Sequence, residues 1–228
     1  MKATRWFAAL LIPVGPAAVA VLRYVLPYNT TDDATEVVRK VAEHQQAQSA
    51  VVWLGFVASM TLVPAVLFVA RVAFREAPRL TSAAVLLMVP GYLSLGWLAA
   101  SDATVLFAVR HGLSLADAAA TYDSLHPAVL AAEAVFVVGH VLGTVLLGCA
   151  LLRSSSVPRW AAVAVLVSQP LHFVAAVIVS SHELDLAAWG LNAMGFVAVS
   201  VAILRMRDDD WGLATSAPVG RPLRTASV

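Results

Sequence analysis

Two ionisable side chains, Glu133 and His140, lie inside an apolar stretch that runs over residues 127–152. Read as one helix, this stretch is long enough to cross a bilayer, which takes about 20 residues. The two side chains are seven residues apart, so they share one helix face and lie roughly 10 Å apart along the axis. Because an ionisable group is costly inside a membrane span, both are candidate functional residues.

Four polar side chains from four different apolar segments share one predicted depth. Each lies 13 residues from an arginine that marks one end of its segment. At 1.5 Å per residue, this places all four roughly 20 Å from that membrane edge. The four residues are Tyr92, His140, His172 and Asn192, and the arginines are Arg79, Arg153, Arg159 and Arg205. The pattern predicts a polar layer within the membrane.

Two carboxylates fall nearer the opposite edge by the same measure. Asp102 lies 23 residues from Arg79, and Glu133 lies 20 residues from Arg153. We therefore expect a pocket that opens on the outer side, with carboxylates at its mouth and the polar layer at its floor. Its walls would be aromatic, formed by Trp97, Phe136, Phe173 and Trp189. Pro90 and Pro170 fall close to the polar layer and are expected to bend their helices.

This arrangement suits acid catalysis on an apolar substrate. A carboxyl group removed from water favours its neutral form, so Glu133 beside Phe136 could donate a proton. Aromatic faces stabilise carbocations, and His140, His172 or Tyr92 could orient the acid or take up the final proton. No metal or other cofactor is required. The simpler interpretations stay open: the carboxylates could be interfacial residues, and the polar layer could be hydrogen bonding between helices.

The composition is that of an integral membrane protein. Hydrophobic residues make up 60% of the 228 residues and charged residues 13%, whereas soluble domains have about 25% charged residues. A net charge of +1 gives no basic surface for nucleic acid. One cysteine, Cys149, excludes an internal disulfide and a cysteine-based metal cluster. A zinc site lacks a clear third ligand, since only two histidines lie within the predicted spans.

Six apolar segments predict an all-α bundle of six transmembrane helices. They cover residues 6–27, 48–70, 80–101, 128–152, 160–180 and 186–204. Lys and Arg divide 11 to 4 between the two sides, which predicts that both termini are cytoplasmic. We expect one domain over residues 1–207 in the plasma membrane, a flexible tail over 208–228, and a first segment that is retained rather than cleaved as a signal peptide.

Two short helices are predicted in the outer connections. The first lies within residues 28–47, with Thr31 as a plausible N-cap and acidic residues in its first turn. The second runs from about Ser114 to Tyr122. Asp32 and Asp33 are interpreted first as a helix start and only second as a diphosphate or metal site.

The fourth and fifth segments resemble a family. The run from Phe136 to Leu166 is similar to a group of six-span bacterial membrane proteins of unknown function, with matches at His140, Gly143, Arg153, Pro158, Arg159 and Trp160. The chain also resembles, in size and layout, the small drimentine-type membrane terpene cyclases of actinobacteria. That resemblance implies a prenylated substrate, although the chain has no D-x-D-D motif. The Ala- and Val-rich composition suits an actinobacterial source.

Two further functions compete with a terpene cyclase-like enzyme. The same pocket could bind or transport a lipid or small molecule without catalysis, although no internal repeat supports a secondary transporter. His140 and His172 could instead ligate a haem, which their equal depth favours and their position on consecutive helices disfavours. The sequence leaves the oligomeric state open.

Overall fold

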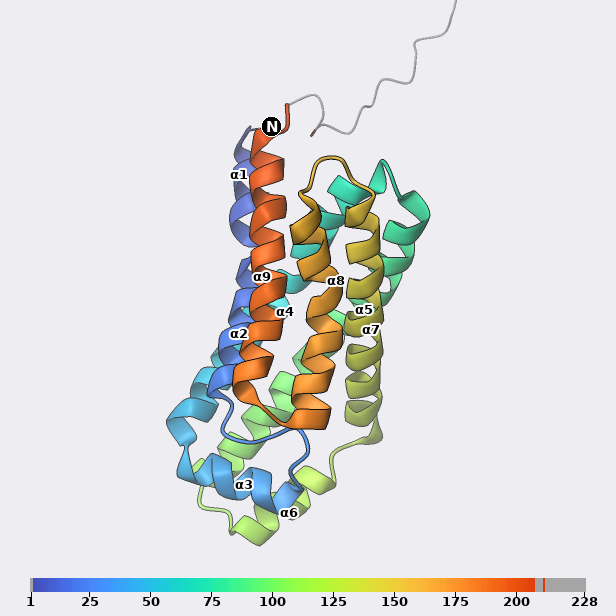
Figure 1. The fold of residues 1–228 in the computed structure, drawn as a ribbon. Coiled ribbons are helices and arrows are strands. Elements are labelled where there is room, and N and C mark those ends of the chain that lie inside the picture. Colours follow the sequence, from blue (N-terminus) through green and yellow to red (C-terminus); the bar gives the residue numbers. More distant parts are fainter. Residues whose placement is uncertain (1, 208–210, 212–228) are drawn as a thin grey trace, which may run out of the picture.

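Long helices dominate the computed structural model, which describes residues 2–207 and 211 (Figure 1). Their order is α1 (Lys2–Leu11), α2 (Val14–Val25), α3 (Ala34–Glu43), α4 (Gln45–Phe74), α5 (Pro78–Arg110), α6 (Leu115–Asp123), α7 (Pro127–Leu152), α8 (Arg159–Phe173), the π-helix η1 (Val174–Val179) and α9 (His182–Arg205). No strand occurs among the described residues. The predicted all-α membrane bundle is therefore confirmed, with six helices long and apolar enough to cross a membrane.

The third span is longer than its apolar run suggests. Helix α5 continues to Arg110, so Asp102 lies within the helix rather than at its end. The extra turns are stabilised by packing: Val105, Leu106 and Ala108 are buried in a small second core with α3 and α6. An amphipathic continuation of this kind escapes a search for uniformly apolar segments.

A proline interrupts the first span but not the fifth. The first span is two helices, because a turn at Ile12 and Pro13 separates α1 from α2. Pro13 has no backbone N–H to continue the helical hydrogen bonds. In the fifth span, Pro170 lies near the end of α8, and the helix continues as the π-helix η1 up to Ser180, which has a φ of 54°. Pro64 and Pro90 lie inside α4 and α5.

Glycines bring α5 and α7 into close contact. A Cβ atom on Gly139 would lie 2.5 Å from the Leu87 carbonyl oxygen and 2.8 Å from the Gly91 Cα atom. A Cβ atom on Gly143 would lie 2.3 Å from the Met88 Cγ atom. The G-x-x-x-G spacing thus serves the close helix packing that it predicts.

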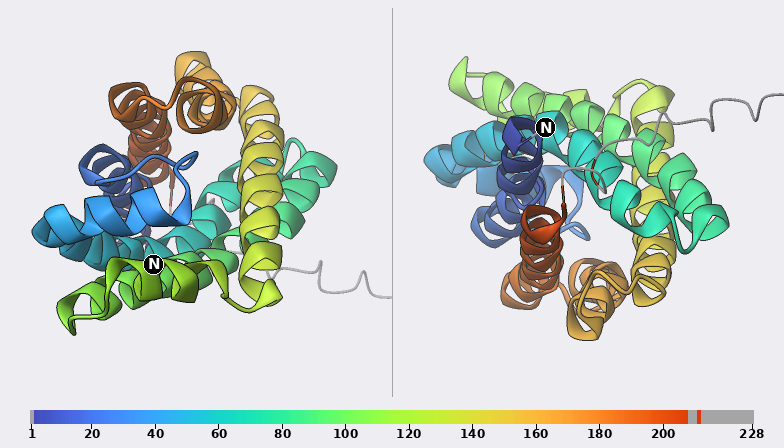
Figure 2. Two further views of the ribbon diagram at one scale, coloured as in Figure 1. Left: turned by 90° about the horizontal axis from the view of Figure 1, so that it is seen from below. Right: turned by 90° about the horizontal axis from the view of Figure 1, so that it is seen from above.

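Both short helices lie across one end of the bundle, opposite the N-terminus (Figures 1 and 2). This confirms the two predicted connection helices. The N-cap of α3 is Asp33 rather than Thr31, since the Asp33 carboxylate accepts a hydrogen bond from the Glu36 amide at 2.8 Å. The loop before α3 therefore extends two residues further than predicted.

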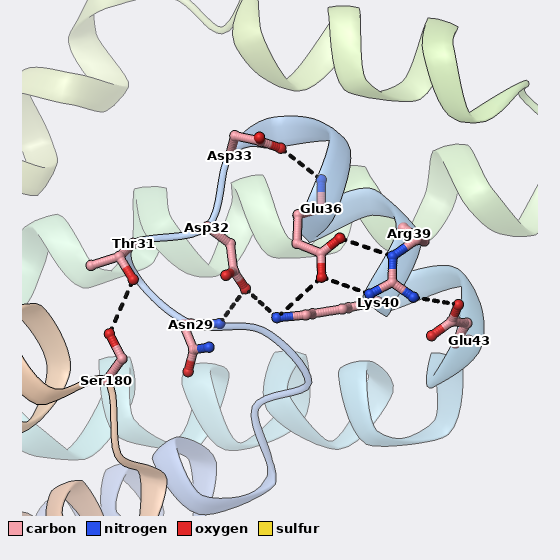
Figure 3. Close-up of polar contacts among 9 residues, drawn as sticks. All are labelled: Asn29, Thr31, Asp32, Asp33, Glu36, Arg39, Lys40, Glu43 and Ser180. Atoms are coloured by element: carbon pink, nitrogen blue, oxygen red, sulfur yellow. Dashed lines mark hydrogen bonds and ion pairs between the residues drawn. The ribbon is translucent and has the colours of Figure 1, made fainter.

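Asp32 also has a structural partner (Figure 3). Its carboxylate accepts from the Asn29 amide at 2.7 Å and from Lys40 Nζ at 2.8 Å. Burial alone would raise the pKa of Asp32, but these hydrogen bonds outweigh it and lower the pKa below its usual value. Asp33 caps the start of α3 and Asp32 is paired with Lys40. The structure therefore supports the helix-start interpretation over a diphosphate or metal site.

The predicted tail lies outside the described residues except for Trp211. This side chain is buried, with its ring 6.2 Å from that of Phe68 and beneath the Arg71 guanidinium at 4.6 Å. Trp211 therefore packs against α4, which the expectation of a featureless tail did not include.

Candidate functional site

A cavity of about 300 Å³ lies at the end of the bundle that α3 and α6 cover. This volume is at the lower end of small-molecule sites, which span about 300–1,000 Å³. Apolar side chains from several helices line much of it, among them Leu22 on α2, Leu95 and Leu98 on α5, and Leu130 on α7. Asp102, Glu133, Phe136, His172 and Trp189 also line it. Five of the ten predicted site residues thus meet in one cavity.

His172 lines the cavity and is paired with Asp185, which does not itself line it. The His172 ring nitrogen Nδ1 lies 2.5 Å from Asp185 Oδ1, and Asp185 is 1% exposed. The other oxygen, Oδ2, accepts from Arg23 Nε at 2.5 Å. A carboxylate bonded to Nδ1 fixes the ring orientation and favours the tautomer with hydrogen on Nδ1. Nε2 of His172 is then the nitrogen that can accept a proton.

The local fold explains where this pair comes from. Ser181 caps α9 by accepting a hydrogen bond from the Leu184 amide at 3.2 Å, and Asp185 follows in the first turn. A carboxylate is favoured at that end of a helix dipole. His182 Nδ1 lies 2.9 Å from the Arg23 carbonyl oxygen and so ties the start of α9 to the end of α2.

A second carboxylate, Asp102, is held by donors from two other elements. The Tyr28 hydroxyl donates to Asp102 Oδ1, and Gln48 Nε2 donates to the same oxygen at 2.8 Å. Both hydrogen bonds fall on Oδ1, which leaves Oδ2 without a described partner. Burial raises the pKa of Tyr28 well above its usual value, and Asp102 raises it further whenever its carboxyl group is ionised. Tyr28 therefore remains a protonated donor at neutral pH.

Glu133 lies at the exposed mouth of the cavity, as its predicted depth implied. It has no hydrogen-bond or ion-pair partner within the described part of the chain. Tyr122 on α6 lines the same cavity, and its pKa is raised mainly by burial and further by the charges of Asp102 and Glu133. The two carboxylates therefore act on one region of the cavity.

The predicted polar layer is buried beneath the cavity. The rings of His140 and His172 lie 5.4 Å apart between centroids, and both pack against Trp189. His140 Nδ1 lies 2.5 Å from the Phe136 carbonyl oxygen, one helical turn before it. Tyr92 and Asn192 are fully buried but do not line the cavity. His172 thus belongs to the cavity floor, while the other three residues lie inside the bundle.

Two predicted aromatic wall residues lie elsewhere. Trp97 is 54% exposed and Phe173 40% exposed, and neither lines the cavity. The prediction counted aromatic residues at suitable depths, but depth does not determine which face of a helix points inward. Both side chains point away from the bundle, where an apolar ring would contact lipid.

The geometry does not fit a haem between the two histidines. Axial imidazoles lie on opposite faces of a haem with the iron between them, and ring centroids 5.4 Å apart leave no room for that plane. Across residues 2–207 and 211, no three His, Cys, Asp or Glu side chains gather as ligands of a metal ion would.

Four residues of this site escaped the sequence reasoning: Arg23, Tyr28, Gln48 and Asp185. Arg23 is one of the four basic residues that the charge distribution assigns to the outer side. A signal was available, because Arg23 lies within the first apolar segment, where an unpaired charge is costly. That cost predicts a buried partner without naming it.

A second cavity, of about 560 Å³, lies between α8 and α9 towards the other end of the bundle. Its lining is mainly apolar, with Arg205 as the charged member. It has no acid–base pair, so the smaller cavity is the better candidate site.

No protein-family model matches this chain, and neither does any curated protein or solved structure. The function must therefore be argued from the site itself.

Proposed function

We propose that this membrane protein is an acid–base enzyme that cyclises or isomerises an apolar, isoprenoid-type substrate in the cavity beneath α3 and α6. The observation that carries the proposal is the Arg23–Asp185–His172 chain beside a partly apolar cavity that Asp102 also lines. An oriented imidazole and a separate carboxyl group supply the base and the acid that such a reaction needs.

Asp102 is the proposed proton donor. It is better enclosed than Glu133, which is exposed at the mouth where water would capture a carbocation. Tyr28 and Gln48 both donate to Oδ1, as they would to the carbonyl oxygen of a neutral carboxylic acid. Oδ2 would then carry the acidic proton. This assignment replaces the sequence-based choice of Glu133.

The proposed reaction is balanced within the site. Asp102 donates one proton to a substrate double bond, which leaves a carboxylate and a carbocation. The electron pair of a second double bond forms the ring bond. His172 Nε2 then removes one proton from a neighbouring carbon, which restores a double bond. Proton return to Asp102 completes an isomerisation without any redox step. The Phe136 and Trp189 rings beside the cavity would stabilise the cation.

The setting of the site is part of the proposal. We propose that the termini face the cytoplasm, that the cavity opens on the outer side of the plasma membrane, and that the chain is related to the small drimentine-type terpene cyclases. The 11-to-4 distribution of basic residues and the six-span layout support these points.

The test is product formation in membranes that contain the expressed protein and a farnesylated precursor, followed by mass spectrometry. We expect a cyclised product of unchanged mass. Asp102→Asn and His172→Gln should each lower turnover by about 10²–10⁴-fold, the usual contribution of a general acid or base. Glu133→Gln, which replaces a carboxylate at the mouth of the same cavity, is the matched control and should retain turnover.

Three outcomes would decide against the proposal or its assignments. A substrate that co-purifies unchanged with the wild type would favour a binding or transport protein. Full turnover by folded Asp102→Asn would exclude Asp102 as the acid. Loss of turnover in Glu133→Gln alone would restore Glu133 to that role.

A further inference from the structure

Six polar side chains are buried at the centre of the bundle, and all but Trp189, which also lines the cavity, lie outside the cavity lining. Each is at most 1% exposed. They come from α5, α7, α8 and α9, and eight of their nitrogen and oxygen atoms have no hydrogen-bond partner within the described residues. The atoms are Tyr92 Oη, His140 Nε2, Thr144 Oγ1, Gln169 Nε2 and Oε1, Trp189 Nε1, and Asn192 Nδ2 and Oδ1.

These side chains form one group rather than scattered defects. The His140 and Trp189 rings are stacked with their centroids 6.0 Å apart. Thr144 follows His140 by four residues on α7, and Asn192 follows Trp189 by three on α9, so each pair shares a helix face. The Tyr92 hydroxyl faces Thr144 across the contact between α5 and α7. Gln169 lies one turn before His172 on α8.

Such a group cannot remain without partners. The Tyr92 and Thr144 hydroxyls face each other and can pair, but the side-chain nitrogen and oxygen atoms of Gln169, Trp189 and Asn192, and Nε2 of His140, have no partner among the described residues. Leaving these buried polar atoms without hydrogen bonds would strongly destabilise the fold. A ligand that hydrogen-bonds to them must therefore accompany the folded state.

The chemistry of the six side chains identifies that ligand. No permanently charged residue is among them, which disfavours an ion. They offer both donors (the Trp189 indole and the amide NH₂ groups) and acceptors (the amide oxygens). His140 Nε2 is also an acceptor, because Nδ1 donates to the Phe136 carbonyl oxygen. Water satisfies donors and acceptors alike, and buried waters typically make about three hydrogen bonds.

We infer that an ordered cluster of water molecules is bound between α5, α7, α8 and α9 and hydrogen-bonds to His140 Nε2. We call this group of six residues the hydrated chamber. It adjoins the cavity floor, since the His140 and His172 rings are 5.4 Å apart. The inference does not rest on the proposed enzyme activity, because a protein without catalysis would hold the same waters.

Hydroxyl-radical footprinting of the purified full-length protein in lipid nanodiscs tests this inference. X-rays generate radicals from internal water, so residues beside bound water are oxidised even when bulk solvent does not reach them. Tyr92, which does not line the cavity, should be oxidised and should incorporate ¹⁸O from labelled water. Phe196 is the internal control, since it is equally buried on α9 but lies in the apolar core. Tyr92 as protected as Phe196 would overturn the inference.

Two variants give an independent measurement. In a dry core, Asn192→Leu and Gln169→Met would remove unsatisfied groups and raise the melting temperature. In a hydrated chamber they remove water-mediated hydrogen bonds, so we expect a lower melting temperature and less oxidation of Tyr92. Ser200→Ala is the matched control, since the Ser200 hydroxyl already donates to the Phe196 carbonyl oxygen at 3.0 Å. A raised melting temperature with unchanged oxidation would contradict the inference.

Discussion

At the scale of single residues, Asp185 has two partners in the site, the His172 imidazole and the Arg23 guanidinium. One of its oxygens orients His172, and the other neutralises Arg23, which is itself partly buried. Neither charge would be stable at this depth alone. The same ion pair that joins the first span to the last therefore also fixes the imidazole that faces the cavity.

This double role predicts a specific pattern in a double-mutant cycle. Arg23→Gln leaves the Asp185 carboxylate buried without its cation and should destabilise the protein by about 3–5 kcal/mol, the usual cost of breaking a buried pair. Arg23→Gln combined with Asp185→Asn should be less destabilising than the sum of the two single changes. Denaturant unfolding in detergent measures all three. Additive effects would show that the two side chains do not interact.

At the scale of elements, the contact between α5 and α7 depends on two glycines facing each other. Gly91 and Gly139 leave no space for a side chain between their helices. Asp102 on α5 and Glu133 on α7 line the same cavity. Tyr92 on α5 and His140 on α7 are buried beneath that cavity. Close approach of these two helices is thus what brings the polar residues of the third and fourth spans together.

Gly139→Ala should destabilise the protein by about 1–3 kcal/mol, because the added methyl group overpacks the interface. Gly96→Ala is the matched control. Gly96 lies on α5, and a Cβ atom there meets nothing within 4 Å. Thermal unfolding should separate the two variants clearly. Equal melting temperatures of the two variants would mean that α5 and α7 accommodate the added methyl group without loss of stability.

The α3 helix at the mouth of the cavity should be sensitive to acid. Hydrogen bonds from Arg39 lower the pKa of Glu36 to about 2, and Lys40 adds to the effect (Figure 3). A carboxyl group with a depressed pKa in the folded state stabilises that state above its ordinary pKa of 4.5. This contribution is lost as the pH falls towards 2.

Hydrogen exchange of the α3 amides, corrected for the intrinsic rate, measures this loss. Protection of residues 34–43 should fall between about pH 4.5 and pH 2. Glu36→Gln should show weaker protection at neutral pH and a flatter profile. A wild-type profile as flat as that of the variant would exclude this ion-pair group as a stabiliser of α3.

At the scale of the whole molecule, the described residues form a bundle with two chemically different ends. Helices α3 and α6, with the cavity beneath them, lie at one end, and the N-terminus and the loop between α7 and α8 lie at the other (Figure 1). Basic residues concentrate at the second end, which the positive-inside rule assigns to the cytoplasm.

Cysteine labelling tests this orientation. In a Cys149→Ser background, Ser124→Cys places a thiol on the loop after α6, and Ser156→Cys places one between α7 and α8. A membrane-impermeant maleimide added to intact cells should label Ser124→Cys only, and both variants after lysis. The reverse pattern would place the cavity on the cytoplasmic side.

The sequence alone determined the class of the protein, its six spans, the two connection helices, and the common depth of the histidines. These features follow from hydrophobicity and helical rise, which are local properties of the chain. The G-x-x-x-G spacing of Gly139 and Gly143 is typical of a close helix contact, and the structure places that contact against α5. Only the tertiary structure decided which side chains face inward and which meet.

Trp97 and Phe173 were wrongly included in the cavity wall, and Arg23 and Asp185 were missed as partners, for one physical reason. In an isolated helix every face is exposed. Which side chains become buried, and which of them pair, depends on the neighbouring helix that each face contacts. Asp185 meets His172 on the preceding helix, and Arg23 lies 162 positions away from Asp185 in the chain. Such a contact exists only once the first and last spans pack side by side.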